Sequence, residues 1–329
     1  MSPPAPLILT PGDPAGIGPE IALKAAIRHP GHFVLMGDEA HLSDLCERNN
    51  FNLKFKHWNV GQDLEPSTVA LHPIRWANTP VAGQPDPSNS QLVISAIETA
   101  VKFAKNNHVS AIITNPIAKS VLYAAGFSHP GHTEYLAALD NTDSTPIMML
   151  ANQFLRAVPL TIHQSLASVP GTITKKLIVE RLIDIHHNLK LDFGIKAPHI
   201  AVCGLNPHAG EDGHLGQEDK LVIAPALETL KAKGINVSGP YPADTLFTPE
   251  ARAQYDVAIG MYHDQALIPA KTLDFHNSVN VTLNLSFIRT SPDHGTAFDI
   301  AGTGQAKPDS LIAAIKMAAQ MSENRQCAS

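Results

Sequence analysis

Three histidines in this chain of 329 residues stand where they could hold a metal ion. His163, His208 and His263 each follow a short apolar run that is typical of a buried strand. Ligands of open α/β sheets bind beyond the carboxyl ends of the strands, so we expect the three imidazoles at one sheet edge. Three imidazoles leave coordination positions free for water or substrate, which predicts one divalent metal ion in an active site. The mid-helix pair His186 and His187 is interpreted as structural.

These residue types leave the metal and its chemistry open. Three imidazoles suit zinc, cobalt or nickel, whereas oxygen ligands from a substrate would also admit magnesium or manganese. A metal that activates water would make a hydrolase, and a metal that binds a substrate hydroxyl would make a dehydrogenase. A non-catalytic sensor on the same fold is a third interpretation, although no DNA-binding segment supports it.

Two glycine-rich segments, residues 10–20 and 294–304, are candidates for holding a nucleotide. In the first, glycines at the start of a predicted helix would allow the backbone to approach an anion, or would only make a tight turn. Prolines interrupt it, so it is not the G-x-G-x-x-G fingerprint. In the second, the Asp299 carboxylate could accept hydrogen bonds from ribose or adenine. The candidate cofactor residues are Gly12, Gly16, His294, Gly295, Asp299 and Gly302.

Several cations and amides could bind an anionic substrate. Lys271, Asn280 and Arg289 follow His263 at equal intervals, and a guanidinium, an ammonium and an amide together suit a phosphate. A solvated surface is the alternative interpretation of this set. His132 and Thr133 lie at a predicted helix start, which favours a carboxylate or phosphate. Lys119 and Asp244 are the candidates for a general base.

Short β-branched runs and longer helical patterns alternate almost from end to end, and they must position these residues. Strands are predicted near residues 6–10, 33–36, 111–114, 157–162, 199–204, 256–260 and 279–283. Helices are predicted near residues 19–28, 39–48, 88–107, 174–189, 217–233 and 310–321. The alternation predicts an α/β fold with a largely parallel sheet. We expect two α/β subdomains with a cleft between them. The first comprises residues 1–125 with 265–329 on the cofactor side, and the second residues 126–264 on the metal side.

The composition excludes several classes of partner. With 44% hydrophobic and 16% charged residues, the chain can bury a large core. Its formal net charge is −6 and its Lys and Arg residues are scattered, so we expect neither nucleic acid nor a membrane surface as partner. No signal peptide or long apolar run is evident. Three separated cysteines predict a reducing compartment, so a cytoplasmic location is expected.

Longer sequence motifs, spread over essentially the whole chain, identify a resemblance to the 4-hydroxythreonine-4-phosphate dehydrogenase family. They are Pro-Gly-Asp-Pro-Ala-Gly-Ile-Gly-Pro-Glu at 11–20, Gly-His-Thr-Glu at 131–134, Cys-Gly-Leu-Asn-Pro-His-Ala-Gly-Glu at 203–211, Pro-Ala-Asp-Thr-Leu-Phe at 242–247, Met-Tyr-His-Asp-Gln at 261–265 and Phe-Ile-Arg-Thr-Ser at 287–291. Residues 294–304 also resemble the adenine-binding loop of isocitrate and isopropylmalate dehydrogenases.

The resemblance implies a fold of isocitrate dehydrogenase type without a Rossmann fingerprint, and a homodimer with the metal site near the subunit interface. It makes His163, His208 and His263 the metal ligands, and His132, Thr133, Lys271, Asn280 and Arg289 the substrate contacts. The cofactors would be NAD or NADP and one divalent metal ion per subunit, zinc, cobalt or magnesium.

The implied reaction oxidises 4-phosphooxy-L-threonine to 2-amino-3-oxo-4-phosphooxybutanoate, which decarboxylates to 3-amino-2-oxopropyl phosphate, in the biosynthesis of pyridoxal 5'-phosphate. Relatives act on other phosphorylated hydroxy acids or on aromatic dihydrodiols, so 4-phosphoerythronate is an alternative substrate. A metal-dependent hydrolase is the more distant alternative.

Overall fold

The computed structural model describes residues 5–129, 131–142 and 144–328. The chain divides into two compact units, Met1–Pro146 with Leu285–Ser322 and Ile147–Asn284 with Glu323–Ser329. The predicted boundaries at 125 and 265 fall earlier in the chain than these. Helix α5 (His132–Asp140) belongs to the first unit because its Tyr135 and Leu136 are buried in that unit's core. The predicted first subdomain included residues 1–4 and 329, which lie outside the described residues.

The first unit contains a parallel run of six strands in the order β3-β4-β2-β1-β5-β12. The central strand β1, with the sequence LILT, is buried throughout, as expected for a strand that helices cover on both faces. Its neighbours are β2 on one side and β5 on the other, so the order of the strands reverses beside β1. The strands are β1 (Leu7–Thr10), β2 (Phe33–Gly37), β3 (Phe55–His57), β4 (Val69–Pro73), β5 (Ala111–Thr114) and β12 (Ile288–Pro292).

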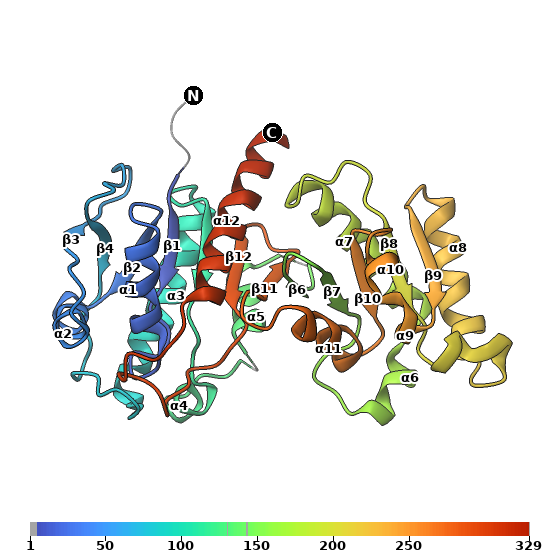
Figure 1. Ribbon diagram of the computed structural model, residues 1–329, viewed down its shortest axis with the longest axis horizontal. Coiled ribbons are helices and arrows are strands. Elements are labelled where there is room, and N and C mark those ends of the chain that lie inside the picture. Colours follow the sequence, from blue (N-terminus) through green and yellow to red (C-terminus); the bar gives the residue numbers. More distant parts are fainter. Residues whose placement is uncertain (1–4, 130, 143, 329) are drawn as a thin grey trace. The chain divides into compact units, whose positions relative to one another are not determined.

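Helices of the first unit begin and end at recognisable residues. Asp38 caps helix α2 by accepting from the backbone N–H groups of Ala40 and His41, and Asn141 ends α5 in the left-handed conformation. In Figure 1 the red helix α12 runs along β12. The Thr290 hydroxyl on β12 donates to the Ala314 carbonyl oxygen on α12 at 2.9 Å. The helices are α1 (Gly18–Arg28), α2 (Glu39–Asn49), α3 (Ser90–Lys105), α4 (Lys119–Ala124), α5 and α12 (Asp309–Ala328), with a single turn η1 (Pro87–Asn89) before α3.

The second unit has the strand order β11-β6-β7-β10-β8-β9. Strands β7, β10, β8 and β9 are parallel neighbours, whereas β6 pairs antiparallel with both β7 and β11. The strands are β6 (Ile147–Ala151), β7 (Arg156–Pro159), β8 (Ile200–Cys203), β9 (Val237–Tyr241), β10 (Val257–Gly260) and β11 (Val279–Leu283). The helices are α6 (Val169–Thr172), α7 (Lys175–Leu191), α8 (Ala224–Ala232), α9 (Ala243–Leu246), α10 (Pro249–Arg252) and α11 (His263–Leu273), with turns η2 (Leu166–Ser168), η3 (Pro207–Gly213) and η4 (Asp219–Ile223).

The α/β class with a largely parallel sheet is confirmed, and the elements depart from prediction at particular places. No strand was predicted at β3, β4, β6, β9 or β12. Residues 217–233 were predicted to form one helix, whereas α8 is preceded by the wider turn η4. Among the described residues, no helix is both long and apolar enough to span a bilayer.

Candidate functional site

The three predicted metal-binding histidines follow three strands of the second unit that are neighbours in its sheet. His163 lies shortly after β7, His208 shortly after β8, and His263 opens helix α11 after β10. Strand β10 pairs with β7 on one side and with β8 on the other, all in parallel. The carboxyl ends of these strands therefore share an edge, as the sequence pattern required.

Two of the three imidazoles come together. The ring centroids of His163 and His263 are 6.2 Å apart, and both rings line a hollow of about 510 Å³ with Tyr262. His208 is not in this group, and within the described ranges no three His, Cys, Asp or Glu side chains of one chain form a set that could hold a metal. One chain therefore brings His163 and His263 together and keeps His208 apart from them.

The donor chemistry of two histidines fits a metal. Nδ1 of His208 lies 2.8 Å from Glu211 Oε2, and Nδ1 of His263 lies 2.7 Å from Asp264 Oδ1. A carboxylate at Nδ1 holds the proton there and leaves Nε2 with a free lone pair, which is how metal-binding imidazoles are commonly oriented. Both rings are thus prepared to bind a cation through Nε2.

The turn that carries His208 has an unusual backbone. Five successive residues, from His208 to Asp212, have φ between 43° and 82°, so the segment is a short left-handed turn in which only Gly210 lacks a side chain. Left-handed conformations cost about 1–2 kcal/mol for each L-residue, and runs of them are rare. Such strain is retained where the surrounding structure enforces it, often at functional sites.

In the first unit, Arg289 and His132 form a buried polar group. Arg289, which is 4% exposed, donates from Nε and Nη2 to Thr114 Oγ1 at 3.1 and 2.7 Å. Burial lowers the pKa of Arg289 to about 10, against the opposing effect of Glu134, so the guanidinium stays charged near neutral pH. Burial and the neighbouring cations Arg289 and Lys119 lower the pKa of His132 well below 6.5. The site thus presents a fixed cation beside a neutral imidazole.

Several buried polar atoms at the carboxyl-end edge of the first unit's strands lack a hydrogen-bond partner among the described residues. Thr10 ends β1 and Asn115 follows β5, at the point where the strand order reverses. Orphaned buried polar atoms are uncommon, and they call for a ligand or a water. The atoms in the first unit that concern this edge are Thr10 Oγ1, Asn115 Oδ1, His132 Nε2 and His294 Nε2.

Three of the four candidate cofactor glycines are required by backbone packing. A Cβ on Gly12 would lie 2.5 Å from the Pro116 carbonyl oxygen, and one on Gly16 would lie 2.9 Å from that of Thr296. A Cβ on Gly302 would lie 2.7 Å from the Ala82 side chain. The tight-turn interpretation therefore explains Gly12 and Gly16, and close packing explains Gly302, whereas Gly295 faces open space and has room for a ligand.

A third segment, around Gly83, contacts both glycine-rich segments. The N–H of Gly83 donates to the Ala15 carbonyl oxygen at 2.8 Å, and a Cβ there would lie 2.9 Å from the Phe298 carbonyl oxygen. The sequence Gly-Gln-Pro-Asp-Pro at 83–87 indicates a turn, but it does not reveal which distant segments the turn contacts. The close approach of three backbones makes a rigid platform out of distant parts of the sequence.

The end of the second glycine-rich segment is fastened to helix α1 by an ion pair. Lys24 Nζ lies 2.7 Å from Glu20 Oε1 and also donates to the carbonyl oxygens of Gly304 and Ala306, each at 2.7 Å. Glu20 Oε1 accepts from the Ala306 N–H at 3.1 Å. The side chains of Glu20 and Lys24 are 2% and 18% exposed, so the pair is shielded from water.

The remaining predicted residues lie in both units. Lys119 begins α4 and its Nζ is close to Gly131, whereas Asp244 is exposed on α9. Thr133 is half-buried in the first turn of α5, and Asp299 is exposed. Lys271 lies in the last turn of α11, and Asn280 on β11 has a buried Oδ1 without a partner among the described residues.

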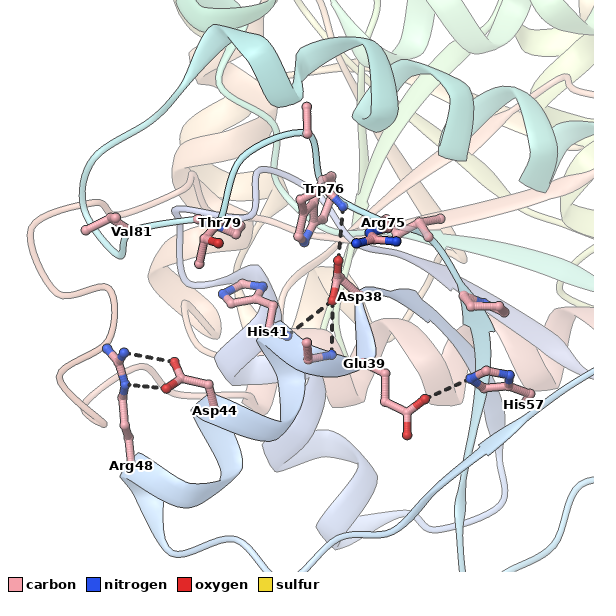
Figure 2. A pocket seen from close by; sticks show the side chains of 15 residues that line it. Asp38, Glu39, His41, Asp44, Arg48, His57, Arg75, Trp76, Thr79 and Val81 are labelled. Carbon is pink, nitrogen blue, oxygen red and sulfur yellow. Dashed lines mark hydrogen bonds and ion pairs between the residues drawn. The ribbon is translucent and has the colours of Figure 1, made fainter.

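A separate hollow of about 830 Å³ lies at the carboxyl ends of β2 and β4 (Figure 2). None of the predicted site residues lines it. Four of its charged groups form two pairs: Arg48 pairs with Asp44 at 2.9 Å, and His57 with Glu39 at 2.8 Å. The exposed Arg75 also lines the hollow. Asp38 accepts from backbone N–H groups, including that of Trp76 at 3.0 Å. These two pairs and Asp38 therefore already have partners within the protein.

The second unit also exposes many large apolar side chains. Leu166, 65% exposed, lines the same hollow as His163 and His263, and Leu215 lies just past the His208 turn at 49% exposed. Single exposed apolar side chains are ordinary at a protein surface, whereas a contiguous patch of them commonly marks a protein interface. The full set in this unit is Phe154, Leu166, Ile183, Leu215, Leu221, Tyr241, Ile268 and Phe275.

Comparison with known proteins gives the class and then the family. A 4-hydroxythreonine-4-phosphate dehydrogenase from Xanthobacter autotrophicus is 47% identical over 334 residues, 98% of this chain and 95% of that protein. The crystal structure of an enzyme of the same name from Klebsiella pneumoniae is 36% identical and superposes with a TM-score of 0.88, over 97% of this chain and 98% of that one. A terephthalate 1,2-cis-dihydrodiol dehydrogenase from Burkholderia xenovorans is 29% identical, with a TM-score of 0.66 over 96% and 98% of the two chains.

The chain is therefore a dehydrogenase, an oxidoreductase that acts on a CH–OH group, as predicted. Residues 29–318 match the family model of the pyridoxal phosphate biosynthetic protein PdxA, and the chain belongs to this family. The resemblance to the 4-hydroxythreonine-4-phosphate dehydrogenase family, which the sequence motifs indicated, is thereby confirmed.

Proposed function

We propose that this protein oxidises 4-phosphooxy-L-threonine with NAD+ or NADP+, in a reaction that requires a divalent metal ion and forms 3-amino-2-oxopropyl phosphate. The observation that carries the proposal is the pair His163 and His263, whose rings share a hollow, in a chain 47% identical to a 4-hydroxythreonine-4-phosphate dehydrogenase. The reaction belongs to pyridoxal 5'-phosphate biosynthesis, which agrees with the family's description.

His163, His263 and a His208 from a second copy of the chain would hold the metal. The separation of His208 from the other two within one chain, and the apolar side chains Leu166 and Leu215 beside each part, support a homodimer that completes the site. When bound, the ion would act as a Lewis acid, favouring ionisation of the substrate hydroxyl and, after oxidation, loss of CO2. Zinc, cobalt and magnesium are the proposed metals.

The chain's own residues hold the phosphorylated substrate. Arg289 supplies a buried, permanently charged guanidinium whose direction Thr114 fixes, and Lys271 and Asn280 add an ammonium and an amide. His132, neutral at physiological pH, can accept or donate a hydrogen bond without repelling the cation beside it, and Thr133 adds a hydroxyl. Fixing the phosphate fixes the substrate carbon that loses hydride, which is where positioning accelerates a reaction.

The dinucleotide would bind to the platform made by the two glycine-rich segments. Gly295, with open space beside it, and the unpartnered Nε2 of His294 are the positions best suited to contact it, together with the exposed Asp299. Gly12, Gly16 and Gly302 would contribute by shaping this platform. Lys119 or Asp244 would take the hydroxyl proton, while hydride passes to the nicotinamide. The resulting β-keto acid loses CO2 and takes up a proton.

The test is a substrate panel with the purified protein, NAD+ or NADP+ and each metal, followed by the absorbance of reduced nicotinamide. Turnover of 4-phosphooxy-L-threonine that disappears with a chelator is expected. Preference for 4-phosphoerythronate would make the enzyme a dehydrogenase of another phosphorylated hydroxy acid, and turnover without nicotinamide would make it a hydrolase. No reduced nicotinamide with any member of the panel would overturn the proposal.

The shared metal site has a test of its own. His163→Ala and His208→Ala should each lose metal and turnover as separate dimers while remaining folded. Mixed dimers of the two variants should recover activity, because one of the two sites then receives His163, His263 and His208 intact. Mixed dimers as inactive as their parents would place all three ligands in one chain.

A further inference from the structure

The loop that carries His208 is held at its base by a buried carboxylate. Asp219, 2% exposed, accepts from the backbone N–H of Leu205 at 2.7 Å and from that of Asn206 at 3.2 Å. The Asn206 side chain donates to the same carboxylate at 2.8 Å and to Glu218 at 2.8 Å. Bonds from several N–H donors to one charged acceptor are strong when water is excluded. The start of the left-handed turn is therefore fixed.

Two glycines show how closely this loop surrounds the carboxylate. A Cβ on Gly204 would lie 2.7 Å from Asp219 Oδ1, and a Cβ on Gly210 would lie 3.1 Å from Oδ2. One glycine precedes His208 and the other follows it. Asp219 thus touches the chain on both sides of the histidine, and its position determines where the turn presents the ring.

Gln265 ties this loop to the one that carries His263. Its Nε2 donates to the Gly204 carbonyl oxygen at 2.9 Å, and its Oε1 accepts from the Met261 N–H at 2.6 Å. The buried Thr161 hydroxyl donates to the Met261 carbonyl oxygen at 2.8 Å. Thr161 stands shortly before His163, so one short series of hydrogen bonds links the approaches to all three histidines.

We propose that Asp219 and Gln265 are positioning residues of the metal centre, which hold the loops of His208 and His263 in place without touching the ion. This inference rests on the proposed assignment of the histidines as ligands. A loop that is already ordered in the metal-free protein loses less conformational freedom when the ion binds. The hydrogen bonds that order the loop therefore raise the metal affinity. Removing groups that orient metal ligands typically weakens binding by about 10- to 100-fold.

The test compares zinc affinity in Asp219→Asn, Gln265→Met and wild type by competition with a chromophoric chelator. Asp219→Asn places an NH2 group against N–H donors, and we expect zinc to bind about 10- to 100-fold more weakly. In the metal-free protein, hydrogen exchange at the Leu205 and Asn206 amides should become faster. Gln265→Met should weaken zinc in the same direction, and it carries the test if Asp219→Asn fails to fold.

Asp212→Asn is the matched control, because this exposed carboxylate lies on the same left-handed turn and its loss changes the charge equally. It should bind zinc as wild type does. Wild-type zinc affinity in Asp219→Asn or Gln265→Met, alongside weakened binding in His208→Ala, would overturn the positioning role alone. Wild-type affinity in His208→Ala would instead remove the ligand assignment, and this inference with it.

Discussion

Replacing Lys24 by Met should destabilise the first unit strongly, although Lys24 is not among the candidate catalytic or substrate-binding residues. The ammonium binds the Glu20 carboxylate and two carbonyl oxygens, each at 2.7 Å. Without it, a carboxylate that is 2% exposed keeps only the Ala306 N–H as donor among the described residues. Removing one partner of a buried ion pair costs about 3–5 kcal/mol. Because the Lys24 side chain is 18% exposed, water can replace part of the loss, and we expect about 3 kcal/mol.

The assay is urea unfolding followed by tryptophan fluorescence, which reports the first unit because both tryptophans, Trp58 and Trp76, lie in its core. Arg48→Met is the matched control, since Arg48 and Asp44 form a pair of the same spacing that is 68% and 48% exposed. Exposed pairs contribute about 0–1 kcal/mol. Lys24→Met should also raise the KM for the dinucleotide. A loss no larger in Lys24→Met than in Arg48→Met would refute the reasoning.

Two further predictions concern the first unit. Desolvation and the nearby cations hold the pKa of His132 in the folded protein well below the value of 6.5 that it has in the unfolded chain. Because the unfolded state then binds more protons, the wild type should lose up to about 1.4 kcal/mol of stability per pH unit below pH 6.5 through this group. The free energy of unfolding of His132→Asn, measured at several pH values, should lack this component, and equal slopes would contradict it. Gly16→Ala should destabilise the unit by about 1–3 kcal/mol because the new methyl would meet Thr296 at 2.9 Å. Gly295→Ala, with open space, should leave the thermal midpoint unchanged, and equal shifts in both variants would contradict the packing argument.

Local patterns predicted much of the framework. The strand at β5 and the strand at β11 were predicted to the residue, because each is a β-branched run between polar residues. Strand β12 was missed because Ile288–Pro292 contains a buried arginine, a threonine and a serine, which read as a polar segment. Arg289 can lie there because Thr114 on the neighbouring strand accepts its hydrogen bonds.

The part of the candidate site that could be predicted from the sequence is the set of residues that follow the ends of strands. Histidines placed after three strands identified a shared sheet edge, since the carboxyl ends of parallel strands lie at the same edge of a sheet. Residue types could not show that His208 stands apart from His163 and His263 in one chain, because that depends on the path of a left-handed turn. Nor could the sequence show which glycines serve packing, because the atoms that exclude a Cβ come from distant segments.

The separation of His208 from the other two histidines has a consequence for how the enzyme is loaded in the cell. On the proposed arrangement, metal binding and subunit association are linked equilibria, and each strengthens the other by the same factor. The fraction of sites that carry metal then depends on the concentration of the protein itself as well as on that of the ion. Dilution would release the metal by mass action, and a rise in expression would activate chains already present.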